Sequence, residues 1–360
     1  MKQIKKVFAG GNTSQGFYSF YHEIIAEDAN HVFILKGGPG TGKSTFMRKV
    51  VRDLVEKGFS IEEFHCSSDA NSLDGIVAPA LKVGIIDGTA PHVVDPKFPG
   101  CVEEIINLGQ YWDEDKIKRQ RDEVLRLTKS NSACYPRAYR YLRAAKCLYD
   151  DMREITRSAT NLGEVNQIVG TLIEEVFHGR KPLLKMGWVR HLFASAITPQ
   201  GPVNELPSIV DGYRNQYILK GEPGTGKSWV LNKVLQHGLE RGLYMEAYHC
   251  PIDPEKLDHL IIPELETAVI TSYPPHIYES EEGVVINLNE CVDRKERDQD
   301  NLHCDHVLFE SLLDQVFKQL RKAKAIHDLL EESYVPNMKF DQIEQVRKRV
   351  VTRILAYNHH

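Results

Sequence analysis

Residues 34–44 read ILKGGPGTGKS, and residues 218–228 read ILKGEPGTGKS. Ten of these eleven positions are identical, and the two stretches lie 184 residues apart. Each fits the pattern G-x-x-x-x-G-K-[ST] between an apolar run and a helical pattern, which predicts a phosphate-binding P-loop. Glycines let such a loop turn its backbone N–H groups toward phosphate oxygens, and the helix that follows adds its positive end. The sequence therefore predicts two sites for a nucleoside triphosphate.

The predicted nucleotide-binding residues are those of the two loops and the residue that follows each. They are Gly37, Gly38, Pro39, Gly40, Thr41, Gly42, Lys43, Ser44 and Thr45 in the first copy, and Gly221, Glu222, Pro223, Gly224, Thr225, Gly226, Lys227, Ser228 and Trp229 in the second. We expect Lys43 and Lys227 to reach the β- and γ-phosphates, and the hydroxyls of Ser44 and Ser228 to hold Mg²⁺. The sequence has no N-K-x-D motif for reading guanine, which favours ATP over GTP.

The similarity extends beyond the loops to the whole chain. Residues 64–66 (FHC), with Asp69 and Asp74, return as residues 248–250 (YHC) with Asp253 and Asp258. The offset between matching residues slides only from 185 to 178 along the chain. Self-similarity at this long period predicts two like domains, which we place at residues 1–182 and 183–360.

Strand and helix patterns alternate in each copy, which predicts an α/β fold with a mainly parallel sheet covered by helices. In the first copy, strands are expected at 7–9, 31–35, 61–66 and 83–87, and a helix at 44–57. Beyond residue 113 the sequence is charged and helical in period, with helices expected at 113–129, 137–157 and 162–177 and a break at 131–136. We therefore expect two tandem P-loop NTPase domains, each followed by its own helical appendage.

Composition restricts the class of protein. A net charge of −5 gives no electrostatic reason to expect nucleic-acid binding, although a local basic patch around Arg137, Arg140 and Arg143 stays open. No segment approaches the roughly 18 uninterrupted apolar residues of a membrane span, and residues 1–11 (MKQIKKVFAGG) contain charges but no apolar core of signal-peptide length. Seven cysteines without a C-x-x-C pair predict free thiols in a reducing compartment. These features favour a cytoplasmic protein without a membrane partner.

Asp87 ends an apolar strand pattern 44 residues after Lys43, a position typical of the Walker B aspartate that holds Mg²⁺. The alternative is an aspartate that only begins the turn at Asp87-Gly88. In the second copy Thr271 stands at the aligned position and adds no negative charge. We therefore expect the first site to hydrolyse nucleotide and the second site to bind it or to regulate.

Asp69, just past the His65-Cys66 strand end, is the candidate for positioning water or a substrate hydroxyl, together with Lys43 and Asp87. Its alternative role is to cap a helix that would start at residues 67–69. His65-Cys66 with His92, and His249-Cys250 with His276, offer three metal ligands in each copy, fewer than the four that zinc prefers. Arg143 and Arg321 occupy matching places, where each is either an arginine finger or a solvated surface residue.

The loops GGPGTGKST and GEPGTGKSW, the repeated His-Cys pair and residues 85–100 (IIDGTAPHVVDPKFPG) resemble a family of bacterial tandem-duplicated P-loop ATPases, also described as nucleotide kinase-like proteins. The resemblance covers nearly the full length of the chain. It implies ATP binding and a duplicated P-loop fold, without naming a reaction or a substrate.

Three functions follow from these motifs. The first is Mg²⁺-dependent ATP hydrolysis, mainly at the first site, that rearranges the two domains. The second is a small-molecule or nucleotide kinase in which Asp69 accepts the proton of an acceptor hydroxyl and the helical appendage acts as a lid. The third is a nucleotide-gated binding module without turnover, acting on a protein or small-molecule partner.

Overall fold

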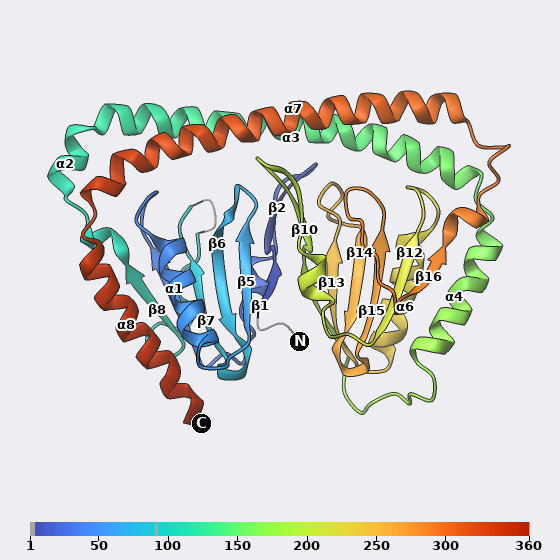
Figure 1. The fold of residues 1–360 in the computed structure, drawn as a ribbon, viewed down its shortest axis with the longest axis horizontal. Coiled ribbons are helices and arrows are strands. Elements are labelled where there is room, and N and C mark those ends of the chain that lie inside the picture. The colour runs from blue at the N-terminus through green and yellow to red at the C-terminus, as the bar shows by residue number, and fades with distance from the viewer. Residues whose placement is uncertain (1–3, 91–92, 360) are drawn as a thin grey trace.

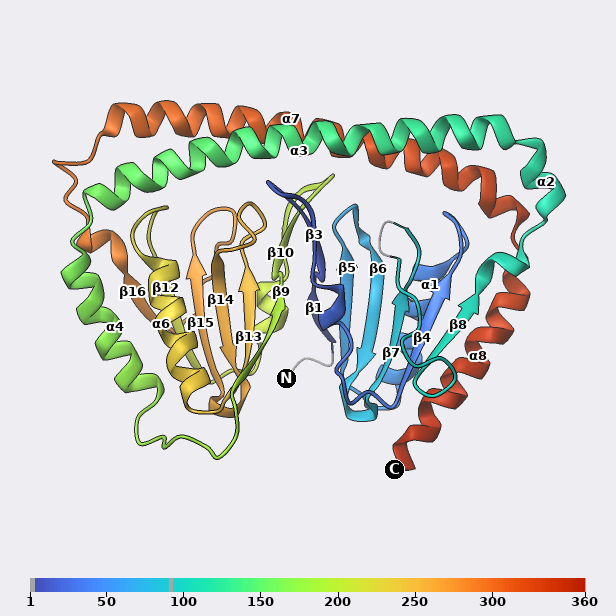
Figure 2. The same ribbon diagram turned by 180° about the vertical axis from the view of Figure 1, so that it is seen from behind.

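The computed structural model describes residues 4–90 and 93–359. Two six-stranded mixed sheets stand side by side below a pair of long helices (Figures 1 and 2). The prediction of an α/β fold with two like halves is confirmed at this level. Within the described residues, no helix has the length and apolar character needed to cross a membrane.

The strands of the two sheets follow one topology. The first sheet has the order β1 (Ile4–Val7), β5 (Ile61–Cys66), β6 (Asp69–Ala78), β7 (Val83–Asp87), β4 (His31–Lys36) and β8 (Glu103–Asn107). The second has the order β9 (Trp188–Leu192), β13 (Tyr244–His249), β14 (Leu257–Ile262), β15 (Thr267–Ser272), β12 (Asn215–Lys220) and β16 (Val284–Asn287). Two hairpins, β2 (Gly10–Thr13) with β3 (Gly16–Ser19) and β10 (Ser195–Thr198) with β11 (Gly201–Asn204), lie between the sheets.

One strand in each sheet departs from the parallel arrangement. β6 runs antiparallel to β5 and β7, and β14 runs antiparallel to β13 and β15, whereas the other pairs are parallel. The strands expected around residues 31–35, 61–66 and 83–87 are confirmed, but β6 was not predicted. The expectation that residues 67–69 start a helix is wrong, because Asp69 begins β6. This strand brings new side chains to the edge of the sheet where the parallel strands end.

The helices of the chain pack on the sheets and above them. They are α1 (Lys43–Val55), α2 (Glu114–Arg119), α3 (Arg121–Ser158), α4 (Leu162–Val176), α5 (Leu206–Ile209), α6 (Lys227–Glu240), α7 (Gln299–Tyr334) and α8 (Phe340–Ala356). The break expected at residues 131–136 is wrong, because α3 continues through Pro136. Proline removes one helix hydrogen bond and costs roughly 3 kcal/mol in a helix interior. Packing of Ala138 and Leu142 against Val316 and Leu320 of α7 offsets that cost and keeps the helix continuous.

The helical appendages cross between the halves. α3 and α7 run antiparallel over both sheets, so α3 leads from the first sheet to the second and α7 leads back (Figures 1 and 2). α4 buries Val165, Val169 and Leu172 in the same apolar cluster as Val230 and Val234 of α6. α8 likewise packs on α1 of the first half. The two sheets lie on either side of residues 182 and 183 in the sequence, and the helix that follows each sheet packs against the other half.

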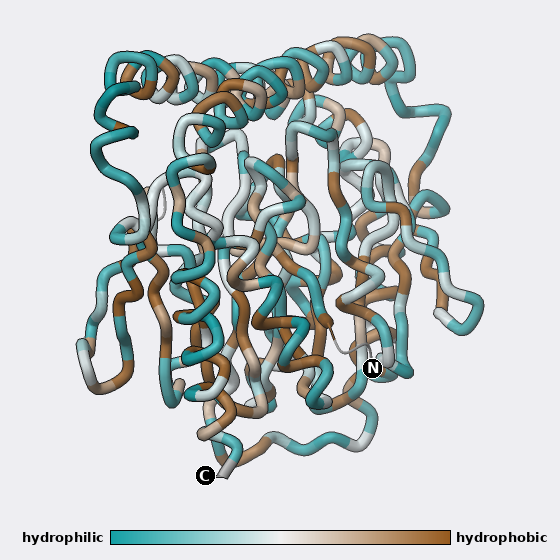
Figure 3. Tube along the Cα trace, turned by 60° about the vertical axis from the view of Figure 1, so that its left-hand side comes forward, coloured by the Kyte–Doolittle hydropathy of each residue, from teal (hydrophilic) through white to brown (hydrophobic). Residues whose placement is uncertain are grey.

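The two halves share a buried contact along β1 and β9. Phe8 and Phe193 exchange two backbone hydrogen bonds of 2.9 Å, and one apolar cluster contains residues of both sheets. Beside it, Lys5 contacts Glu62 and Glu246, and Arg190 contacts Glu62 at 2.9 Å. Hydrophobic residues run along the strands, while hydrophilic and hydrophobic residues alternate in the long helices (Figure 3). This contact fixes the two sheets as one body.

Candidate functional site

Two glycine loops, residues 37–44 and 221–228, lie between β4 and α1 and between β12 and α6. Gly40 and Gly42 have φ of +67° and +83°, and Gly224 and Gly226 have φ of +100° and +96°. These left-handed conformations, which glycine adopts freely, turn the chain sharply before each helix begins. Thr41 donates to Gly38 O at 2.8 Å and Thr225 donates to Glu222 O at 2.9 Å, which holds both loops in the same shape.

Lys43 is the first residue of α1, and its ammonium group folds back over the first glycine loop. Its Nζ donates to Gly37 O at 2.8 Å and to Gly38 O at 3.0 Å, and lies 3.6 Å from Asp87 Oδ2. Backbone N–H groups at a helix start and a lysine ammonium together favour an anion. The loop therefore offers a site for a phosphate-like group with an acidic residue beside it.

Asp87 ends β7 at the edge of the sheet that carries the loop. Its Oδ1 accepts hydrogen bonds from Thr89 N at 2.9 Å and Thr89 Oγ1 at 2.5 Å, while Oδ2 faces Lys43. One carboxylate oxygen thus holds the turn that begins at Asp87, and the other lies beside the lysine of the glycine loop. The strand end at Asp87 was predicted from the sequence, whereas its contact with Lys43 was not.

Asp74 is a second carboxylate at this edge, and the sequence analysis did not select it. Gly75 pairs with Ile86, so the next residues outward, Asp74 and Asp87, lie opposite each other on β6 and β7. Burial raises the pKa of Asp74 to about 7; a hydrogen bond with Tyr21 opposes the rise and the charge of Asp87 adds to it. The side chain repeats as Asp258 in the second half, a signal that was available in the sequence.

Ser44 joins this group through β6. Its Oγ accepts a hydrogen bond from Leu73 N at 3.1 Å, next to Asp74. A serine hydroxyl and two carboxylates are the hard oxygen ligands that Mg²⁺ prefers, so the residues present fit that ion. The first glycine loop therefore combines an anion site with a candidate cation site.

Asp69 lies at the start of β6, where its carboxylate is already engaged. It accepts hydrogen bonds from Asn71 N at 3.1 Å and Ser72 Oγ at 3.1 Å, and Lys324 of α7 lies 3.5 Å away. Asp253 repeats this arrangement with Lys146 of α3 at 3.3 Å. The matched pairs indicate that these aspartates anchor the long helices to the strand ends, and the described contacts of Asp69 do not include Lys43 or Asp87.

The second glycine loop has the same backbone but different neighbours. Lys227 Nζ donates to Gly221 O and to Glu222 O, and lies 5.1 Å from the ring centroid of Tyr273. Burial and, after it, the charge of nearby Lys256 lower the pKa of Lys227 to about 7. Thr271 stands in the place of Asp87. It is buried, and its side chain has no carboxylate. Electrostatic surroundings, more than the loop itself, distinguish the two sites.

Glu222 occupies the position that Gly38 has in the first loop, and its carboxylate makes a contact that a glycine cannot make. Its carboxylate pairs with Arg297, whose side chain is 9% exposed, and its backbone N–H donates to Asn289 Oδ1 at 2.9 Å. These contacts tie the second loop to the segment that follows β16.

The far ends of the long helices cover the two loops. A Cβ at Gly224 would lie 2.3 Å from Arg153 O of α3, and one at Gly40 would lie 2.9 Å from Val335 Cγ2, just after α7. Each loop is thus contacted by a helix that starts over the other half. Glycine is required at both positions by this close approach as well as by φ.

The remaining predicted residues lie around the loops. Pro39 and Ser228 are partly buried, Pro223 is buried, and Thr45 and Trp229 are exposed on the first turns of α1 and α6. Arg143 and Arg321 are exposed on the long helices, as expected for solvated arginines. They lie outside the group formed by Lys43, Ser44 and Asp87.

The two histidines of the repeated His-Cys pairs each make a hydrogen bond to a backbone carbonyl. His65 Nδ1 lies 2.8 Å from Ala70 O, and His249 Nδ1 lies 2.6 Å from Pro254 O, in matching turns. His92 lies outside the described residues. On α7, His327, Asp328 and Glu331 have ligand atoms within 4.8 Å of one another, but Asp328 is paired with Lys324 and the three are not buried. This cluster carries no metal assignment.

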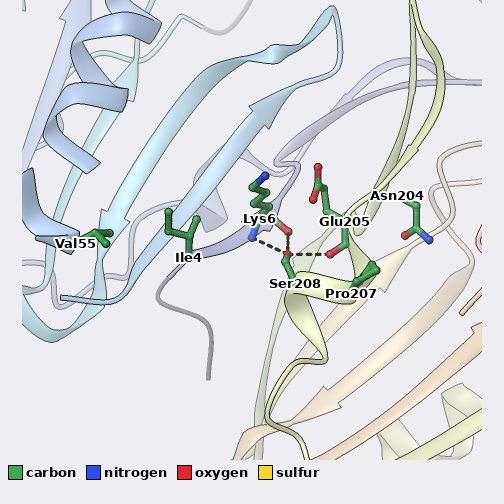
Figure 4. A pocket seen from close by; sticks show the side chains of 7 residues that line it. All are labelled: Ile4, Lys6, Val55, Asn204, Glu205, Pro207 and Ser208. Carbon is green, nitrogen blue, oxygen red and sulfur yellow. Dashed lines mark hydrogen bonds between the residues drawn. The ribbon is translucent and has the colours of Figure 1, made fainter. Parts of the chain in front are cut away.

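A hollow of about 460 Å³ lies between the halves, away from both loops. Ile4 and Val55 line it from the first half, and Asn204, Glu205 and Pro207 line it from the second (Figure 4). Ser208 bridges the halves there by accepting from Lys6 N at 2.9 Å. The residues that line the hollow connect the two halves, and none of them belongs to the glycine loops.

Comparison of the chain with protein-family models, curated proteins and solved structures returned no match.

Proposed function

We propose that the chain binds ATP at both glycine loops, which act as P-loops, and hydrolyses it with Mg²⁺ at the first. The group formed by Lys43, Ser44, Asp74 and Asp87 carries this proposal, because it places an ammonium, a hydroxyl and two carboxylates around one anion site. The repeated loop sequence and the resemblance to tandem P-loop ATPases support it further.

Each of these four side chains has one role at the first site. Lys43 moves from the carbonyls of Gly37 and Gly38 to the phosphate oxygens, where its charge stabilises the transition state. Ser44 and Asp87 hold Mg²⁺, which neutralises charge on the phosphate groups. Asp74, opposite Asp87, accepts the proton of the attacking water. Asp69 positions α7 through Lys324 rather than serving as the base.

The second site binds nucleotide with little turnover. Thr271 supplies no carboxylate for a metal, and Lys227 is more enclosed than Lys43. Nucleotide there stabilises the loop against the end of α3, whose backbone lies beside Gly224. The protein acts in the cytoplasm, where the ATP that this site needs is present and thiols stay reduced.

A phosphate-release assay with Mg·ATP tests this function. Lys43→Ala or Asp87→Asn should lower the rate roughly 100-fold or more, the usual cost of losing charge stabilisation at a transferred phosphate. Lys227→Ala should keep most of the activity. Equal losses from Lys43→Ala and Lys227→Ala would contradict the asymmetry of the sites, and release that begins only when a hydroxyl acceptor is added would establish a kinase instead.

A further inference from the structure

The second half differs from the first at two matched positions on the sheet edge beside the loop. At the constant offset of 184, Asp87 becomes Thr271 and Ser72 becomes Lys256. The alignment is structural as well, because His65 pairs with Leu73 and His249 pairs with Leu257 in the two sheets. The second copy therefore lacks the acid that the first copy has at one position and carries a base at the other.

The Lys256 side chain is enclosed between α3 and the sheet, with 12% of its side chain exposed. Its Nζ donates to Tyr149 Oη at 2.9 Å and lies 3.5 Å from Asp258 Oδ1. Burial opposes the charge, but Tyr149 and Asp258 raise the pKa of Lys256 above its ordinary value. An ammonium has three donors, so a donor is left for a third partner after these two contacts.

Both lysines of the second site are enclosed, with Lys227 only 6% exposed. The charge of Lys256 is among the causes that lower the pKa of Lys227, and the charge of Asp258 opposes that shift. Asp258 has a lowered pKa: burial raises it, but Lys256 and His276 outweigh that effect. The carboxylate is therefore occupied in balancing an ammonium.

The formal charge of the side chains beside the second loop is two units more positive than that beside the first loop. Two units is the charge of one divalent ion. The first copy has one lysine and two aspartates, Lys43 with Asp74 and Asp87, whereas the second has two lysines and one aspartate, Lys227 and Lys256 with Asp258. Mg²⁺ would bring the first group to the net charge that the second already has. A divalent ion at the second site would instead meet two ammonium groups and lack an aspartate at position 271.

We propose that the second glycine loop binds a nucleoside triphosphate free of Mg²⁺, with the Lys256 ammonium contacting the phosphate oxygens where the metal acts in the first copy. This inference rests on the proposed function, since it takes the second loop to be a nucleotide site. Ser228 then contacts phosphate rather than metal. Tyr149 of α3 positions Lys256, so the long helix takes part in shaping this site.

Equilibrium binding of a fluorescent ATP analogue to the full-length Lys43→Ala variant tests the inference, because this variant retains the second site. We expect one analogue bound per chain, with a Kd in EDTA within about twofold of the Kd in Mg²⁺. In the Lys227→Ala variant, which retains the first site, EDTA should weaken binding roughly tenfold or more, as expected for losing a charged contact to phosphate.

Lys256→Ser, in the Lys43→Ala background, introduces the residue of the first copy and should weaken EDTA binding roughly tenfold or more. Lys185→Ser, which removes an exposed ammonium of the second half that pairs with Glu264 at 2.9 Å, is the matched control and should leave the Kd unchanged. Adding Thr271→Asp to Lys256→Ser should make binding depend on Mg²⁺.

The outcomes distinguish the two proposals. Binding to the Lys43→Ala variant only in the presence of Mg²⁺ would overturn the metal-free site while leaving nucleotide binding at both loops intact. No binding to either variant, with or without Mg²⁺, would overturn the proposed function and this inference with it. The comparison of EDTA with Mg²⁺ uses unaltered second-site residues, so it decides the matter even if Lys256→Ser fails to fold.

Discussion

Replacing Lys5 by methionine should destabilise the contact between the two halves by about 3 kcal/mol. Lys5 Nζ lies 2.7 Å and 2.6 Å from the two carboxylate oxygens of Glu246 and 3.2 Å from Glu62. The Glu246 side chain is only 6% exposed. Its remaining partners would be the Tyr244 and Tyr248 hydroxyls and Arg190 at 3.9 Å. Breaking a buried pair costs about 3 to 5 kcal/mol, and these remaining partners place the loss at the lower end.

Urea unfolding followed by circular dichroism at pH 7 measures this loss of free energy. The control is Lys118→Met, which removes an exposed i,i+4 partner of Glu114 and should leave the free energy of unfolding nearly unchanged, because solvent screens this pair. Adding Glu246→Gln to Lys5→Met should recover part of the loss, because it removes the buried charge left without its partner. A Lys5→Met variant as stable as Lys118→Met, or a double variant weaker than the single one, would refute the reasoning.

The same cluster predicts the direction of a pH effect. Burial alone would raise the pKa of Glu62, but Arg190 and Lys5 lower it to about 2. A carboxyl with a lowered folded pKa adds stability above its unfolded pKa near 4.5 and loses it as the pH falls toward 2. The difference between Lys5→Met and the unaltered protein should therefore shrink below pH 4.5, as measured by the same urea curves.

Three further predictions concern α4, the paired histidines and the first loop. Leu172→Ala should lower the free energy of unfolding by about 2 to 4 kcal/mol in urea titrations, because Leu172 is buried against the second half, whereas exposed Leu162→Ala should change it little. Burial and neighbouring His191 lower the pKa of His249 to about 4, so the unfolded chain takes up a proton below its own pKa near 6.5. Stability should fall between pH 6.5 and 4, by about 2 kcal/mol at pH 5, and His249→Asn should flatten this dependence; an equally steep curve for the variant would contradict it. Asp74→Asn should lower ATP hydrolysis roughly 100-fold while Kd for ATP changes little, and an equal rise in Kd would assign the residue to binding instead.

The sequence predicted the strands beside the glycine loops and the position of Asp87 at a strand end, because these follow from local pattern. It did not predict β6, whose first residues are polar and resemble a turn. Without that antiparallel strand, Asp74 has no assigned position, although its repeat as Asp258 was visible. Recognising the residue required the register that places it opposite Asp87.

The exchange of helices between the halves could not be predicted for a different reason. α4 presents an apolar stripe of Val165, Val169 and Leu172 that requires an apolar helix to cover. Duplication gave the chain two such helices, because α1 buries Phe46, Met47 and Val50 where α6 buries Val230, Leu231 and Val234. Hydrophobic pattern does not distinguish these partners. The unbroken length of α3 decides the matter, since it carries α4 across to the second half.

Two loops that agree at ten of eleven positions thus occupy different electrostatic surroundings. The loop fixes where backbone N–H groups and one lysine lie, because that geometry is local to residues 37–44 and 221–228. The charged side chains beside the loop come from segments elsewhere in the chain: Asp74 and Asp87 in one half, Lys256 and Asp258 in the other. A motif of this kind predicts an anion site from its own residues. Whether a metal accompanies the anion is decided by the neighbouring strands, at positions that the motif does not contain.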